Sequence, residues 1–159
     1  MATSTPKPTL ILANVKTVLE LITVANSFRN TVALVNTQFI LPGSIANKLP
    51  ALAIYAHSID FKTVAVGSTP LQMCTLSFNI QGLMRVYSNP ATNIISLMQD
   101  VREKLFEDRK RDSNANNTRV THVELGGEAF GGSFGSPPFV TEPFIGFLMN
   151  VEVDYEENL

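Results

Sequence analysis

Two long segments in which apolar and polar residues alternate constrain the fold more than any other feature. Between Gln72 and Tyr87, polar residues alternate with the apolar residues Cys74, Leu76, Phe78 and Ile80. From Phe144 to Tyr155 the apolar positions are Ile145, Phe147, Met149, Val151, Val153 and Tyr155. Because successive side chains of a strand point to opposite faces, both segments predict strands with one buried face. The chain therefore needs a sheet with one side covered.

Two amphipathic helices are expected to supply that cover. The first runs from about Leu10 to Ser27, and its apolar stripe is Leu12, Val15, Leu19 and Ile22. The second runs from Pro90 to about Arg109, and its stripe is Ile94, Leu97, Val101 and Leu105. Asn89 is a candidate N-cap for it, since proline is favoured at the first helical position.

Shorter segments complete the expected architecture. Composition and local breakers predict further strands at Thr31–Ile40, Leu49–Ala56 and Val120–Leu125. Asp60–Thr69 is interpreted as a connecting loop, and Gly82 as a bulge or a bend. The predicted order is α-β-β-β-α-β-β, which indicates an α+β fold: a mostly antiparallel sheet with two helices packed on one face.

The size and composition favour one domain within an assembly. The chain has 159 residues; we assign residues 1–9 to a flexible N-terminal arm and 10–159 to a single domain. Charged residues make up 16%, against about 25% in typical domains, which fits a subunit with part of its surface covered. With 12 basic and 14 acidic residues, no basic field favours binding of nucleic acid. We expect synthesis in the cytosol and no membrane association.

The sequence gives little support for catalysis. Gly131–Gly135 matches G-x-S-x-G, and a hydrolase using Ser133 is one alternative. A nucleophile elbow needs a helix after its serine, however, and Pro137 and Pro138 follow here. His57, His122 and the single Cys74 have no metal-ligand spacing. We therefore expect a protein that is not an enzyme, without metal or cofactor, and a buried, inert Cys74 thiol.

Two sets of residues are candidates for contacts between subunits. The first is charged: the basic Arg109, Lys110 and Arg111, and the acidic Glu152, Asp154, Glu156 and Glu157. An exposed ion pair contributes only about 0–1 kcal/mol, but pairs repeated around a ring would fix orientation. The other reading of these charges is a solvated face. The second set belongs to the loop Gly126–Pro138 and its flank: Gly126, Gly127, Phe130, Gly131, Gly132, Phe134 and Phe139. This segment is either a mobile surface loop or one that orders on a partner.

The order of elements, with several local patterns, resembles the tail terminator proteins of long-tailed bacteriophages, a group that includes the lambda-type tail-tube capping protein and related minor tail or tail-completion proteins. An amphipathic N-terminal helix is followed by a proline and an apolar strand, Leu49–Tyr55. A long alternating strand, Gln72–Tyr87, precedes an amphipathic helix with the core Asp100–Leu105. The closing strand Val151–Tyr155 ends the similarity, which begins near Leu10.

This resemblance implies a structural virion protein assembled in the host cytoplasm. Such a protein forms a ring, usually a hexamer, on the head-proximal end of the tail tube, stops tube polymerisation and joins the tail to the head connector. Its partners are further copies of itself, the tail tube protein and the connector or neck proteins, and DNA passes through the lumen without specific binding. Two alternatives stay open: a head–tail joining (neck) protein of the same fold, and an unrelated α+β binding module.

Overall fold

The computed structural model describes residues 3–38, 48–66, 69–85, 89–126 and 144–158. Its elements, in chain order, are α1 (Lys7–Leu19), a short 3-10 turn η1 (Val24–Asn26), β1 (Leu34–Asn36), β2 (Ala51–Val66), β3 (Thr69–Arg85), α2 (Pro90–Glu107), β4 (Asn117–Gly126) and β5 (Phe144–Asn158). The five strands form one sheet in the order β1-β2-β3-β5-β4. Only β1 and β2 pair in parallel; the other neighbours are antiparallel. The α+β class is thus confirmed, and the order differs from the predicted one by the added turn η1.

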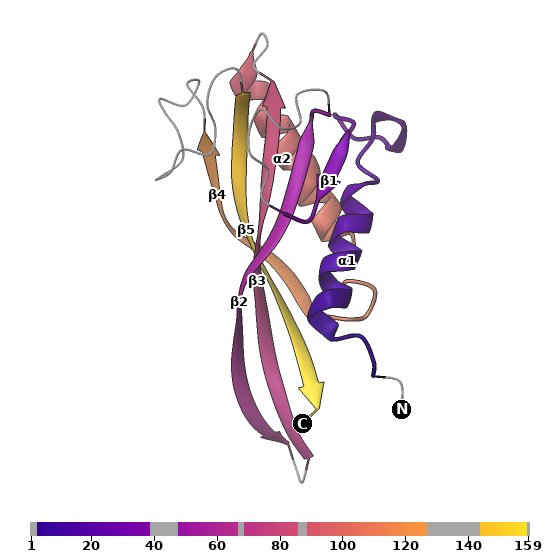
Figure 1. Ribbon diagram of the computed structural model, residues 1–159, viewed down its shortest axis with the longest axis vertical. Coiled ribbons are helices and arrows are strands. Elements are labelled where there is room, and N and C mark those ends of the chain that lie inside the picture. Colours follow the sequence, from indigo (N-terminus) through magenta and orange to yellow (C-terminus); the bar gives the residue numbers. More distant parts are fainter. Residues whose placement is uncertain (1–2, 39–47, 67–68, 86–88, 127–143, 159) are drawn as a thin grey trace.

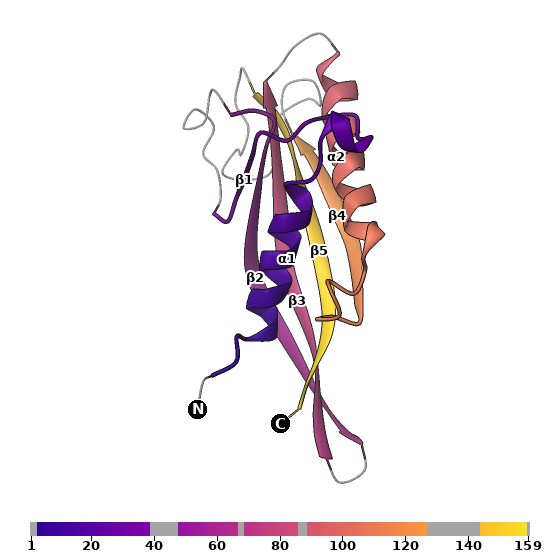
Figure 2. The same ribbon diagram turned by 90° about the vertical axis from the view of Figure 1, so that its right-hand side faces the viewer.

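The two alternating segments occupy the centre of the sheet, as their patterns require. β3 pairs with β5 from Leu71 opposite Asn158 to Arg85 opposite Phe144. Their apolar sides join the side chains of both helices in one core cluster. Figures 1 and 2 show the two helices against the same face of the twisted sheet. The opposite face carries only a small apolar cluster of described residues: Ala51, Ala53, Leu83 and Phe144.

Helix α2 confirms its predicted stripe, whereas α1 is displaced from its predicted range. Ile94, Leu97, Val101 and Leu105 are all 0% exposed. Helix α1 begins at Lys7, so residues assigned to the N-terminal arm belong to it, and it ends at Leu19 rather than Ser27. The β-branched run Ile22–Val24 explains the early end, because such residues lose side-chain freedom in a helix. Thr23 is extended there, and its hydroxyl accepts a hydrogen bond from Asn26 N–H at 3.1 Å.

Several predicted strand boundaries were wrong. The segment 60–69 is not a loop: β2 continues to Val66, and its partner β3 begins at Thr69. Ser58–Thr63 is exposed throughout, so neither face of this part of the strand is buried. β1 keeps only Leu34–Asn36 of the predicted Thr31–Ile40, whereas β4 and β5 are longer than expected.

Gly82 is neither a bulge nor a bend, since the pairing of β3 continues through it on both sides. It lies opposite Phe147, and a Cβ at this position would stand 2.1 Å from Phe147 Cε1. The glycine therefore makes room for an aromatic ring in the core. Asn89 does precede α2, but in a left-handed conformation (φ 56°), and its side chain forms no capping hydrogen bond.

A buried carboxylate joins the segment after α1 to α2. Asp100 is 0% exposed and accepts hydrogen bonds from the backbone N–H groups of Arg29 (3.3 Å) and Asn30 (2.9 Å). The side chains of Arg29 and Asn30 also donate to it, at 2.7 and 2.8 Å. Glu103, on the outer side of the same helix, binds the Arg29 guanidinium at 3.0 Å.

Neither helix combines the length and hydropathy that crossing a membrane requires, as far as the described residues extend.

Candidate functional site

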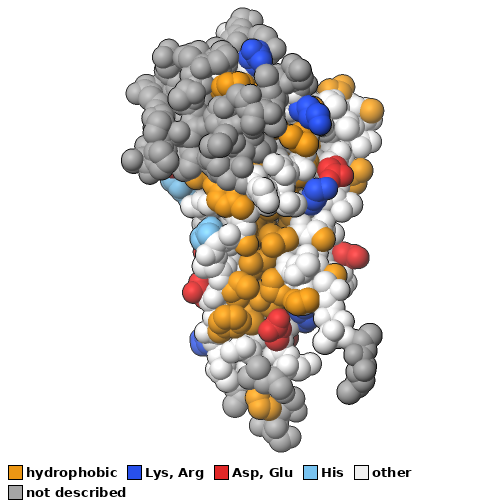
Figure 3. All heavy atoms as spheres, in the orientation of Figure 1, with side chains coloured by type: hydrophobic (Ala, Val, Ile, Leu, Met, Phe, Trp, Pro, Cys, Tyr) orange, Lys and Arg blue, Asp and Glu red, His pale blue; other side chains and the backbone are white. Residues whose placement is uncertain are grey.

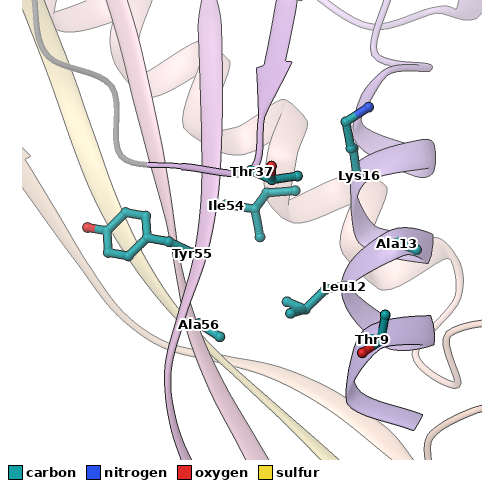
Figure 4. A pocket seen from close by; sticks show the side chains of 8 residues that line it. All are labelled: Thr9, Leu12, Ala13, Lys16, Thr37, Ile54, Tyr55 and Ala56. Atoms are coloured by element: carbon teal, nitrogen blue, oxygen red, sulfur yellow. The ribbon is translucent and has the colours of Figure 1, made fainter. Parts of the chain in front are cut away.

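An apolar groove lies between helix α1 and strand β2. Figure 4 shows Leu12 of α1 and Ile54 of β2 pointing toward each other, with the ring of Tyr55 turned away. The small side chains of Ala13 and Ala56 leave the hollow open, with a volume of about 320 Å³. Thr9, Lys16 and Thr37 supply its polar rim. We call this feature the α1–β2 groove.

Below the groove, β2 and β3 continue past the start of α1 (Figure 1). We call this part the outer hairpin, formed by Ser58–Thr63 of β2 and Gln72–Ser77 of β3, which pair residue by residue. Ile59 lies opposite Leu76, and Phe61 opposite Cys74, so both point to the face that carries the helices. Ile59 is 36% and Phe61 58% exposed. Figure 3 shows hydrophobic side chains in a band down the middle of the face in view.

Each open edge of the sheet carries an irregularity. Among the described residues, β1 pairs only with Ala51–Ala53, so the rest of β2 forms an edge. The register of β2 shifts between Ala56 and Ser58. At the other edge, the register of β4 shifts between Val120 and His122.

The predicted basic cluster is divided by the structure. Arg109 and Lys110 are exposed, as a contact between subunits requires. Arg111 is 0% exposed, so its predicted surface role is wrong. Its guanidinium donates a hydrogen bond to the carbonyl of Leu105 in the last turn of α2. A positive charge is favourable there because the C-terminal end of a helix carries a partial negative charge. Burial lowers the pKa of Arg111, although the nearby Asp108 opposes this effect.

Three of the four predicted acidic residues, Glu152, Asp154 and Glu156, have partners within the subunit, and Glu157 is partly exposed on β5. Arg119 of β4 binds Glu152 at 2.6 Å and also pairs with Asp154 on β5. The contact with Asp154 raises the pKa of Arg119 most, and the contact with Glu152 raises it further. Glu156 accepts a hydrogen bond from Asn116 at 2.9 Å. The structure records no contact for these acidic side chains with Arg109, Lys110 or Arg111 among the described residues, and the hypothesis of pairing between subunits stays a prediction.

Most of the predicted glycine- and phenylalanine-rich set lies outside the described residues: Gly127, Phe130, Gly131, Gly132, Phe134 and Phe139, together with Ser133 of the G-x-S-x-G match. Gly126 is described, and it ends β4 in a buried position.

The histidines and the cysteine occupy separate places. His57 is exposed on β2 and His122 is exposed on β4, on opposite sides of the central strands β3 and β5. Within the described ranges, no three His, Cys, Asp or Glu side chains come together as metal ligands. Cys74 is buried, as predicted, and burial raises the pKa of its thiol. Burial, together with the adjacent Cys74, likewise raises the pKa of Tyr155.

The sequence interpretation missed both apolar surface features. The outer hairpin could have been found from the alternation of Ile59 and Phe61 with Asp60 and Lys62, which is a strand pattern inside the predicted loop. The groove had no such signal, because its two walls come from α1 and β2, far apart in the sequence.

Comparison of the sequence with models of known protein families gave no match, and neither did comparison with curated proteins.

Proposed function

We propose that this chain is a ring-forming structural subunit of a phage tail, which caps the head-proximal end of the tail tube and presents a surface to the head connector. The proposal starts from the resemblance to tail terminator proteins. It implies binding to further copies of the chain and to the last ring of the tube, without a chemical step.

The observation that carries most weight is the exposed apolar surface along β2. Ile59 and Phe61 are exposed on the outer part of β2, and the apolar α1–β2 groove lies nearer to the start of the same strand. An apolar groove and exposed large apolar side chains on one strand together favour an interaction site. Only 16% of the residues are charged, which favours the same interpretation.

A neck protein that joins tail and head is the second candidate. It would use the same kind of ring, and it differs only in which particle component the ring recognises. The exposed apolar surface supports both candidates equally.

The test is the tail-length distribution, measured by electron microscopy, of particles assembled without this chain. We expect tails of uncontrolled length with no heads attached, and restoration of normal tails when the chain is supplied in trans. Tails of normal length that fail to join heads would assign the neck role instead. Intact, infectious particles would refute both candidates.

A further inference from the structure

Helix α2 and the turn after it carry two arginines that share one aromatic ring. The guanidinium carbon of Arg102 lies 5.9 Å from the centre of the Phe106 ring, and that of Arg109 lies 4.8 Å from it. The sum of these distances, about 11 Å, is the largest separation that the two cations can have. Cation–π attraction to the ring restrains both of them. We call Arg102, Phe106 and Arg109, with the exposed Lys110 beside them, the α2 arginine surface.

No described carboxylate neutralises this surface. The acidic residues of the same segment have other partners. Glu103 binds Arg29 at 3.0 Å. Glu107 binds Lys104 at 2.6 Å. The carboxylate of Asp108 accepts hydrogen bonds from two backbone N–H groups of the following turn. Within the described ranges, the α2 arginine surface takes part in no ion pair, so it is a local excess of positive charge on a chain with a formal net charge of −2.

A groove beside Arg102 extends this surface to strand β4. It has a volume of about 240 Å³, and its walls are Met98 and Arg102 of α2 and residues 120–123 of β4. Figure 2 shows β4 running alongside α2. Met98, Val120 and Val123 give the groove an apolar part. A segment that carries an apolar side chain next to a carboxylate can therefore place the first in the groove and the second on Arg102.

We propose that the α2 arginine surface binds an acidic segment of another protein, with carboxylates on Arg102 and Arg109 and an apolar side chain in the adjoining groove. A guanidinium donates two parallel N–H groups to a carboxylate, and arginine clusters are a recurring means of recognising acidic motifs. Because Phe106 already restrains both arginines, little side-chain freedom is lost on binding. This inference goes beyond the proposed function and holds for a terminator, a neck protein or another binding module alike.

Other anionic partners fit this surface less well. Single-stranded nucleic acid needs open aromatic faces and an extended basic groove. Here the Phe106 ring is engaged by two guanidinium groups, and the chain has 14 acidic against 12 basic residues. A second copy of the chain is also less suitable, because Glu152 and Asp154 already bind Arg119 within the subunit.

The experiment is a fluorescence anisotropy titration of labelled poly-L-glutamate with the purified full-length chain at low ionic strength. This probe presents carboxylates at every short spacing. The test variant is Arg102→Gln with Arg109→Gln. Lys16→Gln with Lys62→Gln is the matched control, because it removes the same charge from α1 and β2, where Lys62 is exposed and the Lys16 side chain is 41% exposed. Oligothymidylate with the same label and charge is the comparison probe.

We expect the lysine control to bind poly-L-glutamate as the wild type does, and the arginine variant to bind at least tenfold more weakly. In NMR spectra of the wild type, the probe should shift the amide signals of residues 98–110 and 120–123. Undetectable binding, equal weakening in both double variants, or shifts confined to other residues would overturn the proposal. Tighter binding of oligothymidylate would assign a phosphate partner instead. Self-association that only the arginine variant loses, without binding of the probe, would assign a second copy.

Two further variants and one further probe test the parts of the surface separately. Arg109 is exposed, so Arg109→Gln alone keeps the fold and should still weaken binding several-fold if the double variant is unstable. Phe106→Leu keeps an apolar contact but removes the cation–π attraction, and it should also weaken binding with both arginines present. A copolymer of glutamate and tyrosine should bind more tightly than poly-L-glutamate, because tyrosine supplies a side chain for the groove. Equal affinity of the two polymers would contradict the role of the groove.

Discussion

Replacing Asp100 by alanine tests how much its buried carboxylate contributes to the free energy of unfolding. Its fully buried carboxylate accepts four hydrogen bonds from Arg29 and Asn30, two of them from backbone N–H groups. Removing one partner of a buried ion pair costs about 3–5 kcal/mol. The Arg29 side chain is 49% exposed and stays hydrated in the variant, so we expect about 3 kcal/mol, the lower end.

Glu103→Ala is the matched control, because Glu103 binds the same guanidinium at 3.0 Å but is 42% exposed. Water screens that pair, and its loss should change the free energy of unfolding only slightly. Urea unfolding followed by circular dichroism measures both variants. A loss of about 3 kcal/mol lowers the melting temperature by roughly 6–12 °C in a chain of this size. Equal losses for the two variants, or a loss below about 1 kcal/mol for Asp100→Ala, would refute this reasoning.

Three further predictions concern stability. Leu105→Ala should cost about 2–5 kcal/mol in urea unfolding, because Leu105 is fully buried; a cost below about 0.5 kcal/mol would show that the stripe is misplaced. Gly82→Ala should cost about 1–3 kcal/mol, since its methyl group meets the Phe147 ring, and Gly82→Ala with Phe147→Leu should recover part of that loss if the clash is the cause. Hydrogen bonds from the N–H groups of Asp112 and Lys110 lower the pKa of Asp108, so its stabilisation is complete above the ordinary value of 3.8 and is lost as pH falls through the lower value. The difference in melting temperature between wild type and Asp108→Asn should therefore be constant from neutral pH to about pH 5 and shrink below it; a difference that persists in acid contradicts the assignment.

The parts of the fold that sequence reasoning predicted are those with a buried and an exposed side. The alternation in β3 and β5 and the stripe of α2 are direct consequences of one-sided burial, and their apolar positions lie in the core. The errors fall where burial is two-sided or absent. Gly82 was taken as a break because its packing partner, Phe147, is distant in sequence. The outer part of β2 was taken as a loop because both of its faces meet water, and the alternation of Ile59 and Phe61 with polar residues is too short to stand out.

The candidate surfaces were predicted less well, for a related reason. A charge in the sequence does not reveal which partner it meets: Glu152 and Asp154 bind Arg119 of a neighbouring strand. Arg111 follows two exposed basic residues, but three successive residues from Arg111 to Ser113 have positive φ, between 49° and 65°, where the chain turns after α2. Its side chain lies inside the subunit, although the sequence places it in a surface cluster.

The register shifts at the two open edges of the sheet have a consequence for the unassembled chain. A regular edge strand presents a continuous row of unpaired backbone donors and acceptors, with which a strand of another molecule can form hydrogen bonds. Here the shifts between Ala56 and Ser58 and between Val120 and His122 interrupt both rows. Copies of the chain that meet in solution are therefore hindered from pairing with each other through the backbones of these edges. Any specific contact that another molecule makes along these edges must then depend on side chains.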